Sequence, residues 1–316
     1  MGQKNKIKER IRGVSVALCT PTLRNYEIDY EGLKEETRFV IEGGVTEGKG
    51  VLKVAAALGE GQFLKDVEYR RVLETVVDAS NSKVPVLAGI FGGNVRHAIE
   101  MAKLAEDIGI DGLQVQTPSY SRPSEEEVFL YYKMINDATN LGILVYNTPW
   151  AASGFEIRPQ LMSRLAELDN VVAVKWECLD VINWAGCLRL FSEKLNFIDN
   201  SWQTHATGPL GHMLGAKGLV SFTANFDPKL DLEFWSLLEN RQYDKFIEIW
   251  SEKVVSFWVA LGENPLPSLG EGPFMKALME LAGKPCGPPL PPQVELTDEN
   301  KEKLRKVCTS VGLIKK

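Results

Sequence analysis

The sequence has little that would tie it to a membrane, to nucleic acid or to the secretory route. No apolar run approaches the length needed to cross a bilayer. The opening residues MGQKNKIKERIRG are polar and basic without an apolar core, so no secretory signal is expected. The 42 acidic residues outnumber the 36 basic ones, which argues against a dedicated surface for nucleic acid or anionic lipid. We therefore expect a cytoplasmic protein whose partners are small molecules.

Cysteine and histidine are too few and too scattered for a disulfide framework or a metal site. The five cysteines are odd in number and form no CxxC pair, which indicates reduced thiols. The three histidines lie apart and lack the spacing of metal ligands. No metal is therefore expected.

Short runs rich in Val, Ile and Leu alternate with segments of helical spacing. The chain has 316 residues, enough for one large domain. Strands are expected over residues 14–20, 50–57, 84–90, 112–117, 142–146, 171–175, 196–200 and 218–223. Eight strand–helix units predict an α/β fold, an eight-stranded parallel TIM barrel over residues 1–240. The helical spacing that follows predicts a C-terminal helical extension over residues 241–316.

Several helix starts carry recognisable capping residues. Asp29, Asn94 and Ser124 are predicted N-caps, and Ser124 with Glu127 makes a capping box. Pro228 is placed to open a helix in its first turn.

Lys175 is the most informative residue, because it closes the apolar run over residues 171–174. Lysine is rarely buried unless it is used or paired. Parallel barrels place their chemistry at the C-terminal ends of strands, where this lysine is expected. Removal from water disfavours the ammonium form, and a neutral amine can form a Schiff base with a ketone. The alternative is a lysine that reaches solvent or pairs with a carboxylate such as Glu177.

The order of several motifs resembles the dihydrodipicolinate synthase and N-acetylneuraminate lyase family of class I, pyruvate-type aldolases. The motifs are VALCTPT, VPVLAGIFGGNVRHAIEMAKLAEDIGIDGLQVQTPSYSRP, YNTP, VVAVKWE, GAKGLVSFTANFDP and ENPLPSLGEGPFMKALMELAG. The resemblance covers nearly the whole chain. It implies a Schiff base at Lys175 with a 2-oxo acid, and proton transfer by Tyr146. It needs no cofactor, because the iminium itself is the electron sink.

The resemblance also implies a homodimer or homotetramer, in which Tyr120 reaches into a neighbouring subunit's site. Both Tyr120 and Tyr146 could instead be ordinary core aromatics with satisfied hydroxyl groups.

Two departures from the family pattern bear on the second substrate. Where relatives carry a Thr pair after the second strand, this chain has Ala57 and Leu58. After YNTP, where dihydrodipicolinate synthases place an Arg, it has Trp150. We therefore expect an aldolase that uses pyruvate with a bulky or weakly acidic aldehyde and is not a true dihydrodipicolinate synthase. Its substrate-binding residues are expected to be Ala57, Leu58, Trp150, Glu177 and Val220.

Trp176 and Trp202 could broaden this pocket beside Trp150, or could pack between the barrel and its helices. Two other functions stay open from the sequence. One is a Schiff-base dehydratase or hydratase that uses Glu177 or His205 as acid and base. The other is a catalytically lapsed barrel that binds a small molecule as a sensor or serves as an assembly partner.

Overall fold

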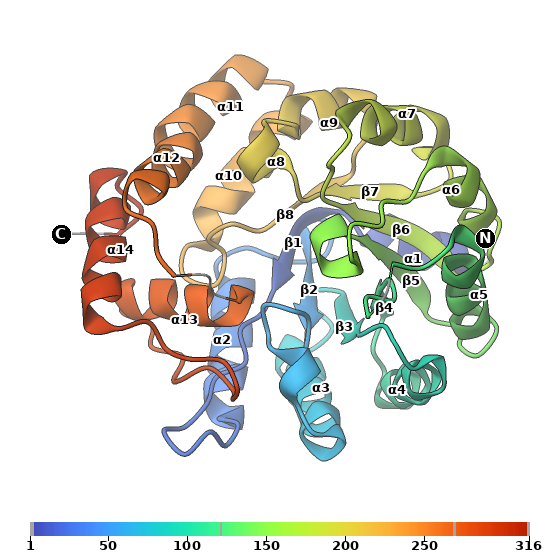
Figure 1. The fold of residues 1–316 in the computed structure, drawn as a ribbon, viewed down its shortest axis with the longest axis horizontal. Helices are drawn as coiled ribbons and strands as arrows, with labels where there is room; N and C mark the ends of the chain where they lie inside the picture. The colour runs from blue at the N-terminus through green and yellow to red at the C-terminus, as the bar shows by residue number, and fades with distance from the viewer. Residues whose placement is uncertain (1–2, 121, 268–269, 315–316) are drawn as a thin grey trace.

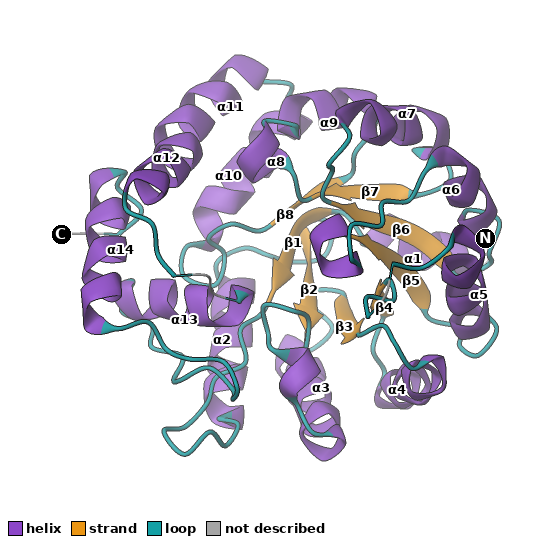
Figure 2. Cartoon of the chain, in the orientation of Figure 1, coloured by secondary structure: helices purple, strands orange, loops and turns teal. Residues whose placement is uncertain are grey.

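The computed structural model describes residues 3–120, 122–267 and 270–314. Its centre is a closed barrel of parallel strands in sequence order from β1 to β8 (Figures 1 and 2). The strands are Gly13–Ala17 (β1), Gly50–Val54 (β2), Val86–Ile90 (β3), Gly112–Gln116 (β4), Gly142–Asn147 (β5), Val171–Trp176 (β6), Asn196–Asp199 (β7) and Gly218–Val220 (β8). The predicted fold class is confirmed.

Helices between successive strands cover the outside of the barrel (Figure 1). They are Tyr30–Glu42 (α2), Asp66–Ser80 (α3), Val95–Ile108 (α4), Glu125–Asn136 (α5), Pro159–Leu165 (α6), Val181–Phe191 (α7), Trp202–His205 (α8), Gly208–Leu214 (α9) and, after the last strand, Pro228–Glu239 (α10). An additional helix, α1 (Gln3–Arg10), precedes β1. In the described ranges no helix is both long and apolar enough to cross a membrane.

The chain after α10 is helical, as the sequence predicted. It forms α11 (Tyr243–Trp250), α12 (Ser256–Glu263), α13 (Glu271–Leu281) and α14 (Asp298–Ser310), and a π-helical turn over Ser251–Val255 joins α11 to α12. In Figure 1 these helices gather on one side of the barrel, away from α4 and α5.

The predicted capping residues lie at the helix starts. Asp29 accepts a hydrogen bond from the Gly32 amide at the start of α2, and Asn94 accepts from the Arg96 amide at the start of α4. Ser124 forms the capping box with Glu127. Each cap satisfies amide groups that the helix itself leaves without a partner, so these termini are determined locally.

Apolar side chains fill the interior of the barrel on the side away from the two cavity lysines. The buried cluster there is Ile7, Ile11, Val51, Leu87, Leu144, Val172, Ala173, Ile198 and Val220. Side chains on one face of a strand recur every second residue. Two residues beyond Val51 on β2 and Ala173 on β6 come Lys53 and Lys175. The apolar core is therefore capped by two lysines toward the C-terminal ends of the strands.

Candidate active site

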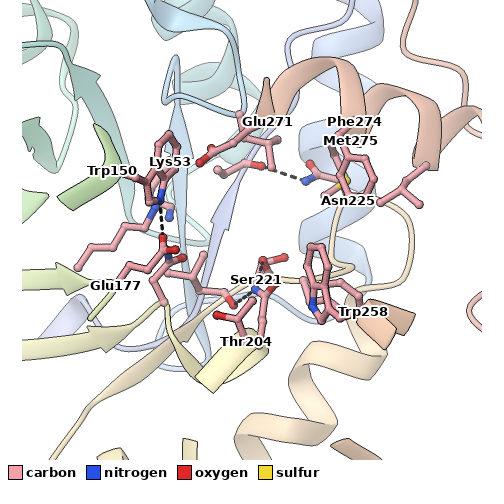
Figure 3. Close-up of a pocket in the computed structure, with 18 residues that line it drawn as sticks. Lys53, Trp150, Glu177, Thr204, Ser221, Asn225, Trp258, Glu271, Phe274 and Met275 are labelled. Atoms are coloured by element: carbon pink, nitrogen blue, oxygen red, sulfur yellow. Dashed lines mark hydrogen bonds between the residues drawn. The ribbon is translucent and has the colours of Figure 1, made fainter. Parts of the chain in front are cut away.

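A cavity of about 240 Å³ lies at the C-terminal ends of the strands and is partly covered by α12 and α13. The barrel strands contribute Ala17, Lys53, Lys175 and Val220 to its wall. The C-terminal helices contribute Trp258, Glu271, Phe274, Met275 and Leu278. In Figure 3 Trp150 and Glu177 stand on one side of the cavity and Trp258 on the other.

Lys175 lies within this cavity, and its side chain is nearly withdrawn from water. On β6 it is paired in register with Tyr146 of β5, and its Nζ lies 4.3 Å from the centre of the Tyr146 ring. Among the described residues its Nζ makes no hydrogen bond or salt bridge. Burial lowers the pKa of Lys175 below the usual 10.5, while the negative charges of Glu271 and Glu177 offset part of that effect. A lysine in this state is prepared to act as a nucleophile.

Tyr146 lies beneath that amine with its hydroxyl group buried. Within the described residues neither this hydroxyl nor the buried hydroxyl of Thr148 makes a hydrogen bond of good geometry, but the two groups interact, and Thr148 lowers the Tyr146 pKa against the effect of burial. Burial raises the pKa of the Tyr146 phenol well above 10, and the charge of Glu271 adds to the increase. Buried hydroxyl groups without partners are uncommon and need an explanation. Tyr146 does not itself line the cavity, but a polar group bound at the neighbouring Lys175 amine would provide one.

Glu177 is held by other side chains and does not pair with Lys175. Its Oε2 accepts hydrogen bonds from Trp150 Nε1 at 3.0 Å and from Asn200 Nδ2 at 2.6 Å (Figure 3). The alternative that Lys175 is explained by an ion pair with Glu177 therefore fails.

Most of the other predicted site residues also meet around the cavity. Leu58, Trp150 and Val220 line it, whereas Ala57 does not. Tyr120 lies on the loop after β4 with its side chain fully exposed, so it is not a core aromatic. His205 is exposed, and its Nδ1 contacts Thr204 Oγ1 at 2.8 Å.

The proposal that three tryptophans broaden the pocket is wrong for two of them. Trp176 is fully buried and stacks with Phe197. Trp202 is 1% exposed and packs on Phe234. Neither lines the cavity: Trp176 of β6 packs on a neighbouring strand, and Trp202 of α8 packs among the surrounding helices, where large rings find apolar partners.

Two charged residues of the cavity were missed by the sequence analysis. Lys53 is a charged residue inside the apolar strand GVLKV, a signal that was available and overlooked. Glu271 begins α13, and nothing local in the sequence indicates that it would reach a cavity built from strands far earlier in the chain.

Comparison with known proteins agrees with this architecture. The model of the Dihydrodipicolinate synthetase family matches residues 10–311. The 4-hydroxy-tetrahydrodipicolinate synthase of Methanopyrus kandleri is 33% identical over 311 residues, covering 96% of this chain and 98% of that protein. The solved dihydrodipicolinate synthase of Acinetobacter baumannii complexed with pyruvate has a TM-score of 0.83 at 27% identity, covering 96% of this chain and 100% of that one. A monomeric dihydrodipicolinate synthase variant has a TM-score of 0.84 at 26% identity, covering 97% and 98%.

These relatives overturn one expectation from the sequence. The chain was expected not to be a true dihydrodipicolinate synthase and to prefer a bulky, weakly acidic aldehyde. Proteins 30–33% identical over 95–96% of the chain are named 4-hydroxy-tetrahydrodipicolinate synthases, so that exclusion is wrong. The absence of polar ligands at Ala57, Leu58 and Trp150 does not decide the charge of the cavity, because Lys53 of β2 also lines it. A carboxylate can be met by a cation from a different strand.

The match runs along nearly the whole chain, and the barrel encloses a buried lysine beside a buried tyrosine at its strand ends. Members of the matching family are class I aldolases, which act on pyruvate and aldehydes. The chain therefore belongs to the Dihydrodipicolinate synthetase family and is a carbon–carbon lyase of the class I aldolase type.

Proposed function

We propose that the cavity binds pyruvate as a Schiff base on Lys175 and joins the resulting enamine to an aldehyde, as in a 4-hydroxy-tetrahydrodipicolinate synthase. The observation that carries this proposal is the Lys175 amine, which lies in the cavity, has no ion pair among the described residues and is 4.3 Å from the centre of the Tyr146 ring. Burial favours its neutral form, which is the nucleophilic one.

The proposed chemistry begins when the Lys175 amine adds to the ketone carbon of pyruvate. Tyr146 stays protonated at neutral pH, because its pKa is raised, and so can donate a proton to the departing oxygen. Loss of water leaves an iminium, and loss of a proton from the adjacent methyl group gives the enamine. The enamine carbon attacks the aldehyde, and water then releases the product from Lys175.

Glu271 and Glu177 support the cationic intermediate. Both carboxylates line the cavity and interact electrostatically with Lys175. Electrostatic groups already in place at the site of developing charge lower the barrier, because they need no reorganisation during the reaction.

Borohydride trapping with pyruvate tests this function. We expect the mass of reduced pyruvate to be added at Lys175, and Lys175→Ala to lose both the label and turnover. Lys103→Met, on the exposed face of α4, is the matched control and should label fully. Turnover with pyruvate and aspartate semialdehyde should exceed that with other aldehydes. A labelled enzyme that ignores aspartate semialdehyde would contradict the synthase assignment, and an unlabelled one would contradict the Schiff base.

We also propose a homodimer or homotetramer in which Tyr120 enters the neighbouring site. A fully exposed tyrosine on a loop at the strand ends supports this arrangement. The monomeric variant among the solved relatives means that assembly must be measured for this chain.

A further inference from the structure

Lys53 is a second lysine inside the barrel. It lies on β2, in register with Ala17 of β1 and Leu87 of β3, and its side chain lines the same cavity as Lys175. Only 1% of the residue is exposed. Within residues 3–120, 122–267 and 270–314, its Nζ makes no hydrogen bond or salt bridge. An unpaired, fully buried lysine is costly, and proteins rarely keep one without a use.

The charged groups around Lys53 do not balance, and a bound anion would offset the excess of positive charge. Lys175 from β6 and Glu271 from α13 are the charged groups that act on it. Burial lowers the pKa of Lys53 well below 10.5, the charge of Lys175 lowers it further, and Glu271 opposes both. The other carboxylate of the cavity, Glu177, is already hydrogen-bonded to Trp150 and Asn200. Among the described residues that line the cavity, the two amines therefore share one carboxylate, Glu271, for which no hydrogen bond is found.

A 2-oxo acid carries its carboxylate on the carbon next to the ketone. If Lys175 takes the ketone, the carboxylate must lie within a few bond lengths of the same amine. The loop after β2 offers no hydroxyl group there, because it carries Ala57 and Leu58. Lys53 lines the cavity, and among the residues that the structure describes it makes no ion pair that would compete for this carboxylate.

We propose that Lys53 binds the carboxylate of the 2-oxo acid, as an ammonium–carboxylate ion pair, while Lys175 condenses with the ketone. This inference rests on the proposed Schiff-base function of Lys175. The substrate carboxylate stabilises the ammonium form of Lys53, which takes its proton from water, while the Lys175 amine that attacks the ketone is neutral. Like-charge repulsion disfavours the state in which both amines are charged, so an ammonium at Lys53 is compatible with a neutral amine at Lys175. Lys53 would thus bind the carboxylate of the substrate.

The test compares pyruvate with methyl pyruvate, which has the ketone but no charge. Both are trapped with borohydride at increasing concentration in the wild type, Lys53→Met, Lys53→Gln and the control Lys103→Met, and the labelled residue is located by mass spectrometry. We expect both Lys53 variants to need roughly tenfold to a hundredfold more pyruvate for half-maximal labelling of Lys175, the loss typical of one charge-assisted pair. Half-saturation with methyl pyruvate should stay unchanged, which also shows that the variants are folded.

Three outcomes would overturn the inference. They are an unchanged half-saturation with pyruvate, an equal shift for pyruvate and its ester, or wild-type enzyme that does not prefer pyruvate to the ester. The last comparison needs no variant and so holds even if both variants fail to fold. Label on Lys53 instead of Lys175 would overturn both assignments. Wild-type enzyme labelled by neither compound would overturn the proposed function itself.

Discussion

At the scale of single residues, the chemistry of this protein depends on what burial does to amines and phenols. The same loss of water that lowers the pKa of Lys175 and Lys53 raises that of Tyr146. The cavity therefore holds two amines that readily give up protons, and a buried phenol that keeps its own lies against one of them. That combination suits nucleophilic attack by an amine followed by proton donation to the oxygen that leaves.

Removing the Tyr146 hydroxyl tests the role of that phenol. We expect Tyr146→Phe to lower kcat by about a hundredfold to ten-thousandfold, the range of general acid–base catalysis, measured in a coupled steady-state assay. Tyr132→Phe is the matched control, since its hydroxyl is also buried but donates to the Val115 carbonyl at 2.8 Å. The control should cost about 1 kcal/mol of stability and leave kcat nearly unchanged. Equal losses of kcat in both variants would remove Tyr146 from the mechanism.

Lys53 should make the fold less stable at neutral pH than at high pH. Its folded-state pKa lies below the ordinary 10.5, so the unfolded chain binds the extra proton. The free energy of unfolding therefore rises with pH from the folded-state pKa up to about 10.5. Lys53→Met removes this cost, so the variant should be more stable than the wild type at pH 7, by a margin that shrinks toward pH 10. Urea unfolding across this range measures the margin, and a constant difference would contradict the argument.

At the scale of elements, the loop after β2 and helix α13 are joined by a buried ion pair. Lys276 Nζ lies 2.6 Å from Glu60 Oε2, and the two side chains are 3% and 0% exposed. Glu60 Oε1 also accepts hydrogen bonds from the Leu290 amide and from Gln293 Nε2. Because the same helix carries Glu271 into the cavity, this pair fixes the cover of the active site to the barrel.

Breaking that pair should destabilise the protein strongly. Lys276→Met leaves the Glu60 carboxylate buried without its cation, for which we expect a loss of roughly 3–5 kcal/mol in urea unfolding. Lys301→Met removes the more exposed pair with Glu280 of α13 and should cost less than about 1 kcal/mol. Similar losses of unfolding free energy in the two variants would mean that the buried Lys276 pair stabilises the fold no more than the exposed one. Adding Glu60→Gln to Lys276→Met should recover part of the stability.

At the scale of the whole molecule, a barrel provides the reactive strand ends and its own C-terminal helices cover them. The cavity takes walls from β1, β2, β6 and β8 and from α12 and α13. Tyr120 is the predicted site residue that stays fully exposed, on the loop after β4. The proposed role of Tyr120 therefore depends on a second subunit that covers it.

Mixing two inactive variants tests that requirement. The Lys175→Ala variant lacks the proposed nucleophile but keeps Tyr120. The Tyr120→Phe variant lacks the hydroxyl group that is proposed to enter the neighbouring site but keeps Lys175. If Tyr120 acts across an interface, mixed oligomers contain complete sites, so activity after mixing should exceed the sum of the separate samples. Sedimentation of each sample shows whether oligomers form. An active monomer at assay concentration, or mixing without any gain, would confine Tyr120 to its own chain.

The sequence by itself determined the barrel, the helical extension, the helix caps and the position of Lys175 at the end of a strand. All of these depend on local signals, such as apolar runs, capping residues and a lysine at the end of a strand. Only the tertiary structure decided which residues share the cavity. Barrel closure brings Lys53 of β2 and Lys175 of β6 into one space, and α13 folds back to add Glu271. The wrong exclusion of dihydrodipicolinate synthesis has the same origin, because the charge balance of a cavity is summed over strands that lie far apart in the chain.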